Sequence, residues 1–156
     1  MNKETQYIIK SFESTLSGQP WFGRAVYEIL EEVDEAKVNI NPNGSDHSMI
    51  ILLWHMNTWA DFVLGSLENK TVDEMKAIEA NDWREIDPKT HTWEKGIDQL
   101  KSTHKKIIDL LNQKDDDFLS EIVPTRKFNF RFMLNGLIQH NIYHLGQVAY
   151  VKKMLG

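Results

Sequence analysis

The chain has 156 residues, of which 41% are hydrophobic, so it has the length of one domain and can bury a core without disulfides. It contains no cysteine, which excludes disulfides and thiolate ligands, so a transition metal would need ligands such as histidine, aspartate or glutamate. The net charge is −5 and the basic residues are dispersed, which argues against a nucleic-acid-binding surface. We expect a single domain over residues 1–156.

The N-terminal stretch MNKETQYIIKSFEST carries scattered charges and has no long apolar run or small-residue cleavage site, so it predicts no signal peptide. The longest apolar run, residues 49–54, is too short to cross a membrane. We therefore expect a cytoplasmic protein without a membrane partner.

The first half of the chain predicts two long helices and a short one. Apolar residues at helical spacing predict a first helix over residues 3–17, and a shorter helical piece is expected at about 22–33. After an NPNG turn, Ser45 or Asp46 is a good N-cap for a long helix that ends near Leu67.

The second half predicts two more long helices. Residues 71–88 are polar and should hold only short helical turns, whereas apolar residues at helical spacing predict a helix over about 90–112. The aspartates at 115–117 should end this helix, and a last helix is expected at about 129–154. The pattern as a whole predicts an all-α protein, a four-helix bundle with a short extra helix.

The segment HNIYHLGQ in the last predicted helix combines His140 and His144, four residues apart, with Tyr143 and Gln147 on the same face. The rest of that face is apolar or very small, so the polar cluster should point into the bundle. A histidine pair at this spacing can direct two imidazole nitrogens to one ion. Gly136, one turn earlier, leaves a gap beside the ring of His140.

A third histidine, His55, lies in the middle of an apolar stripe of the helix that contains HSMIILLWHMNTWADF, so it should also face the core. Three neutral imidazoles without a fourth protein ligand would leave a coordination position open to water or substrate. Trp59 and Phe62 are candidates to line the resulting pocket, although aromatic residues at helical spacing are more often part of the core. The three histidines could likewise be core residues, because a buried histidine commonly forms a hydrogen bond with a neighbouring carbonyl.

The remaining histidines rank lower as site residues. His104 falls on the apolar stripe of the third long helix. It is either a boundary residue of that helix or a residue that reaches the site as a fourth ligand or a proton shuttle. His47 and His91 lie at predicted helix starts and are left out of the site. Asp61 lies off the face of His55, so no carboxylate is evidently placed as a general base.

The sequence resembles the DinB family of four-helix-bundle proteins, which includes the YfiT-like metal-dependent enzymes. The resemblance extends over nearly the whole chain and is carried by PWFG at 20–23, LWH at 53–55 and, most specifically, GLIQH and YHLGQ between 136 and 147. It implies a triad of ligands for a divalent metal, commonly nickel or zinc, at His55, His140 and His144. Members of that family include maleylpyruvate isomerases. They also include thiol-dependent S-transferases, which use bacillithiol.

The function expected from these features is a metal-dependent enzyme, either a thiol-dependent S-transferase or a hydrolase, because a bound metal can lower the pKa of a thiol or of water. Its partner would be a small-molecule substrate such as a low-molecular-weight thiol. Gln147 and Tyr143 are candidates for substrate contacts or for fixing the second ring nitrogen of a ligand.

Three alternatives remain open. The protein could bind a metal or small ligand without catalysis, or form a structural dimer in which the histidines are core residues. Apolar residues opposite His140, namely Ile138, Ile142, Leu145 and Ala149, make a homodimer plausible under each interpretation. Haem ligation is a weaker alternative, because the chain has no Cys-x-x-Cys-His attachment site.

Overall fold

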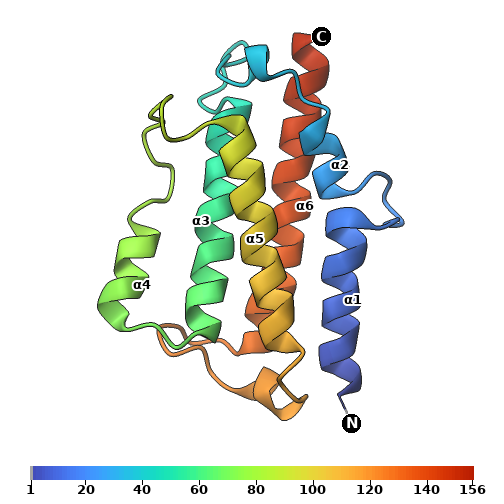
Figure 1. Ribbon diagram of the computed structural model, residues 1–156, viewed down its shortest axis with the longest axis vertical. Coiled ribbons are helices and arrows are strands. Elements are labelled where there is room, and N and C mark those ends of the chain that lie inside the picture. Colours follow the sequence, from blue (N-terminus) through green and yellow to red (C-terminus); the bar gives the residue numbers. More distant parts are fainter. Residues whose placement is uncertain (1) are drawn as a thin grey trace.

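A computed structural model describes residues 2–156, and over this range the chain is all-helical with no β-strand (Figure 1). The predicted all-α helical bundle is confirmed. None of the helices in this range combines the length and the apolarity needed to cross a membrane. The elements in chain order are α1 (Lys3–Ser17), α2 (Val26–Glu31), the 3-10 helix η1 (Glu35–Lys37), α3 (Met49–Leu67), α4 (Val72–Glu79), α5 (Trp93–Leu111), the 3-10 helix η2 (Asp117–Ser120) and α6 (Phe130–Leu155).

The long helices α1, α3, α5 and α6 form the bundle, with α3 and α5 running in one direction and α1 and α6 in the other (Figure 1). α3 and α5 can run parallel because the connection between them, which contains α4, returns along the outside of the bundle. α6 packs against α3 in the antiparallel direction. The two helices that carry the predicted histidine triad are therefore neighbours.

The two predicted helices between residues 22 and 67 begin later than expected. The hydroxyl of Ser45 exchanges hydrogen bonds with the backbone of His47, accepting from its N–H at 3.2 Å and donating to its carbonyl at 3.1 Å, so it does not cap α3. Ser48 takes the N-cap position instead. In the short piece expected at 22–33, Gly23 adopts a φ of +138°, which a helix cannot include, and α2 begins only at Val26.

Side-chain caps set the start of the later helices. Thr71 and Glu74 form a capping box at α4, which accounts for the short helix inside the polar stretch 71–88. Thr92 accepts a hydrogen bond from Lys95 N–H at α5, and Asn129 accepts one from Phe132 N–H at α6.

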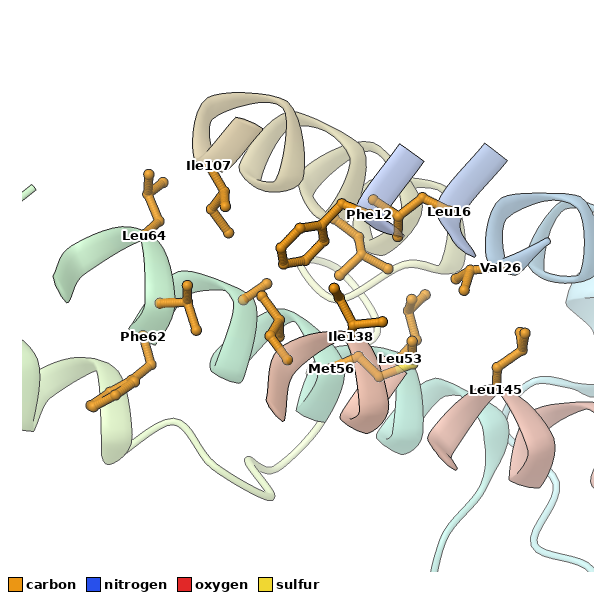
Figure 2. Close-up of a cluster of buried hydrophobic side chains, with 14 of the residues drawn as sticks. Phe12, Leu16, Val26, Leu53, Met56, Phe62, Leu64, Ile107, Ile138 and Leu145 are labelled. Carbon is orange, nitrogen blue, oxygen red and sulfur yellow. The ribbon is translucent and has the colours of Figure 1, made fainter. Parts of the chain in front are cut away.

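The core lies between the four long helices, where Phe12, Met56, Ile107, Ile138 and Leu145 are among the buried side chains (Figure 2). Ile138 and Leu145 belong to the side of α6 that suggested a second subunit. Both are covered within this chain, because α6 also packs against α1 and α2. The apolar side of α6 therefore no longer supports a homodimer, which remains a prediction.

Candidate metal centre

The structure brings together the three histidines predicted as a metal triad. His55 Nε2 lies 3.0 Å from His144 Nε2 and 3.0 Å from His140 Nε2. One ring nitrogen from each residue lies within 4.8 Å of those of the other two. His55 and His144 are buried, and His140 is partly exposed.

Helical geometry accounts for this convergence. The spacing of four residues places the rings of His140 and His144 one turn apart on α6, with centroids separated by 4.4 Å. α3 crosses beside them and inserts the His55 ring at 4.9 Å from His140 and 4.5 Å from His144. Each histidine is held by a helix rather than by a loop, so the group is rigidly positioned.

Hydrogen bonds fix the tautomers of two of these rings. His55 Nδ1 lies 2.5 Å from Asp82 Oδ1, and His144 Nδ1 lies 2.5 Å from Gln147 Oε1. A carboxylate or amide oxygen accepts, so the ring proton in each case is on Nδ1. Nε2 of His55 and of His144 then carries a free lone pair. Gln147, chosen from the sequence as a candidate contact, thus lies at the cluster.

Burial keeps these imidazoles neutral. Desolvation lowers the pKa of His55 and of His144, although the Asp82 carboxylate opposes the shift at His55 and the hydrogen bond to Gln147 opposes it at His144. The pKa of His140 falls to about 3, first through burial and then through repulsion from His144 and His55. At neutral pH the Nε2 atoms of His55 and His144, whose ring protons are on Nδ1, therefore face each other with no proton between them.

Lone pairs that face one another at 3.0 Å repel, and a cation between them would remove this repulsion. The separation matches a metal site, because two nitrogens each at about 2.1 Å from an ion are about 3.0 Å apart at a right angle and about 3.4 Å apart at a tetrahedral angle. The donor set and its spacing therefore fit a divalent metal ion.

Asp82 is the residue of the site that the sequence did not reveal. It follows α4 in the connection to α5, where the pattern indicated only a polar stretch. Its Oδ1 also accepts a hydrogen bond from Trp59 Nε1 at 3.2 Å. One carboxylate oxygen thus orients His55 and ties it to Trp59, a residue that the sequence had suggested as a pocket wall.

Trp83 covers the outer side of the cluster. Its ring stacks on His55, with centroids 3.6 Å apart and planes at 9°, and on its other face it stacks on His47, at 4.1 Å and 8°. Trp83 has a φ of +47°, which is uncommon for a bulky residue and is often found at functional sites. His47, which sequence analysis left out of the site, is therefore separated from His55 only by the ring of Trp83.

Other candidates from the sequence lie at varying distances from the cluster. The rings of Tyr143 and His144 form a T-shaped pair with centroids 5.0 Å apart, but Tyr143 is 66% exposed. Asp61 accepts hydrogen bonds from Gln99 and Thr103 of α5 and is not part of the histidine cluster.

Of the two roles considered for His104, a boundary residue of its helix or a fourth ligand or proton shuttle, the contacts of its ring do not support the second. Its Nδ1 donates to the Leu100 carbonyl at 2.8 Å, and its Nε2 accepts from Asn141 Nδ2 at 2.9 Å. Both nitrogens are occupied, and the ring packs near Phe12 and Tyr27, so His104 is a buried residue of the core.

We expect His104 to make the metal-free protein sensitive to acid. Burial lowers its pKa to about 4, whereas an unfolded histidine has a pKa of about 6.5. Between these values the unfolded chain binds more protons, so the free energy of unfolding decreases as the pH falls from about 6.5 toward 4. The contribution of His104 to this decrease is about 2 kcal/mol between pH 7 and pH 5.

Urea unfolding of the metal-free protein at pH 5 and pH 7 measures this effect. Comparison with a His104→Gln variant isolates the contribution of His104, because all other histidines are common to the two proteins. An equal loss of stability in the variant and the wild type would contradict the assignment.

Comparison with known protein families gives a match to the DinB superfamily over residues 22–148. This range runs from the segment before α2 to the middle of α6 and includes His55, His140 and His144. A search of curated proteins gave no match.

Proposed function

Because this chain belongs to the DinB superfamily, we propose that it is a metal-dependent enzyme whose divalent cation, nickel or zinc, is held by His55, His140 and His144. The observation that carries the proposal is the approach of three neutral imidazoles through Nε2, with the Nδ1 protons of His55 and His144 already committed to Asp82 and Gln147. A divalent cation held between these nitrogen lone pairs would stabilise the buried arrangement.

The reaction we propose is transfer of a low-molecular-weight thiol to an electrophile, or a hydrolysis. Three protein ligands leave coordination positions open, and a bound cation would supply Lewis acidity that lowers the pKa of a thiol or of water. The chain itself orients the ligands. Asp82 and Gln147 hold two of the imidazoles, and the stacked ring of Trp83 shields His55 from solvent.

A second candidate is a protein that binds a metal or a small ligand without turnover. The arrangement of Asp82 favours this alternative, since the oxygen that faces the cluster already accepts hydrogen bonds from His55 and Trp59 and is not a free base. The two candidate functions share the metal site and differ only in whether the bound molecule is converted to a product.

Turnover measured with and without metal tests the proposal. Untagged protein loaded with zinc or nickel, and the same protein after chelation, would be assayed in two reactions. One is displacement of the halide of a chromogenic aryl halide by a thiol, which forms a C–S bond and releases halide ion and a proton, and the other is hydrolysis of a nitrophenyl ester. We expect turnover by the loaded protein and background rates for the chelated protein and for His55→Ala. Bound metal without turnover in either assay would favour the non-catalytic alternative.

A further inference from the structure

A second feature between α3 and α6 is an apolar pocket that adjoins the histidine cluster. Its volume is about 170 Å³, and nearly all of its lining atoms are apolar. The walls include Trp59 and Phe62 of α3, Phe128 of the loop before α6, and Phe132, Gly136 and His140 of α6.

Two of these walls connect the pocket to the candidate metal centre. His140 lines the pocket and directs its Nε2 toward His55. Trp59 also lines the pocket and donates its indole N–H to Asp82, which holds the other nitrogen of His55. A molecule seated in the pocket would therefore lie next to the ligand cluster.

The pocket offers no free charge among the described residues that line it. Its one charged side chain is Arg126, which forms an ion pair with Glu79 of α4. The guanidinium carbon of Arg126 lies 4.5 Å from the centre of the Phe62 ring, so the cation is also stacked on an aromatic face. The chemistry of the walls thus favours an uncharged apolar group.

The position of Gly136 keeps the pocket open. A Cβ atom built at this residue meets no atom within 4 Å, so no neighbouring side chain requires glycine there. Because Gly136 lines the pocket, a larger side chain at this position would extend into the space that a ligand would use.

We propose that this pocket binds an uncharged apolar group of the substrate, about the size of one aromatic ring, and so places the reacting atom of the substrate beside the three histidines. The size follows from the volume, since an apolar protein cavity of about 150 Å³ accommodates benzene. The role in catalysis rests on the proposed function, whereas the binding of an apolar group does not require a metal.

The test uses toluene as the probe and metal-free protein, with binding followed by NMR chemical shifts. We expect saturable binding at one site, weakened at least about ten-fold by Gly136→Leu, which corresponds to about 1.4 kcal/mol. Gly136→Ala adds a single methyl group to open space, so it should fold like the wild type and weaken binding to a smaller extent.

Gly146→Leu is the matched control, because Gly146 lies on the same helix, also meets no atom within 4 Å of a built Cβ, and is not among the residues that line the pocket. It should leave toluene binding unchanged. Absence of saturable binding, equal weakening by the two leucine variants, or tighter binding of benzoate than of toluene would overturn the proposal. Metal content, measured separately, reports on the proposed function, so the two ideas can fail independently.

Discussion

The double variant His140→Ala, His144→Ala is expected to bind no divalent metal, whereas the wild-type protein should bind about one equivalent of zinc or nickel. The variant loses both ligands from α6 and keeps only the His55 imidazole, and one nitrogen cannot hold an ion against water. Elemental analysis of untagged, dialysed protein measures the difference directly. An affinity tag is avoided because its histidines would bind metal themselves.

His91→Ala is the control for nonspecific histidine effects. His91 lies before α5, where its Nδ1 accepts a hydrogen bond from Asp87 N–H, and it is not part of the cluster. This variant should retain about one equivalent of metal. A wild-type protein that remains folded but takes up neither zinc nor nickel would contradict the metal proposal and leave the histidines as core residues.

The same comparison has a thermodynamic readout. A ligand that binds only the folded state stabilises it by about 2.7 kcal/mol at a concentration 100 times its Kd. Added zinc or nickel should therefore raise the melting temperature of the wild type and of His91→Ala, and leave that of the double variant unchanged.

The approach of the three histidines was predictable because it depends on local geometry. The helical period alone places His140 and His144 on one face, and the apolar stripe around His55 indicates that its ring points inward. In a bundle of long helices, two inward faces have a high chance of meeting.

His104, for which two roles were left open, shows the limit of that reasoning. The helical wheel correctly places this ring on the buried face of α5. It cannot show which neighbouring helices the ring faces, and the ring lies near Phe12 and Tyr27 and bonds Asn141 rather than joining the cluster.

Asp82 and Trp83 could not be predicted because they reach the site through the path of a long connection. Between the end of α3 and the start of α5 the chain forms α4 and then turns back, with Asn69 and Trp83 at positive φ. This path is set by tertiary packing rather than by a periodic pattern. The capping box of Thr71 and Glu74 fixes the start of α4 but gives no indication that Asp82 will meet His55.

Replacing Asp82 is expected to have the largest effect among changes that leave all three histidines in place. Asp82→Ala removes the acceptor of the His55 Nδ1 proton. The ring is then free to rotate, or to place its proton on Nε2, where the proton would prevent this nitrogen from coordinating the metal. We expect metal affinity to fall by about 100-fold, the upper end of the range for residues that support metal ligands. Competition with a chromogenic chelator measures this affinity.

The graded variant Asp82→Asn separates orientation from charge. An asparagine oxygen can still accept the hydrogen bond from His55 Nδ1–H, so this variant keeps the tautomer of His55 but lacks the negative charge. We therefore expect its metal affinity to fall by about ten-fold. Trp59→Phe removes only the other donor to Asp82 Oδ1 and should have the smallest effect. If Asp82→Ala binds metal as tightly as the wild type, His55 does not depend on this hydrogen bond for its orientation. An equal loss for alanine and asparagine would instead assign the effect to the charge of the carboxylate.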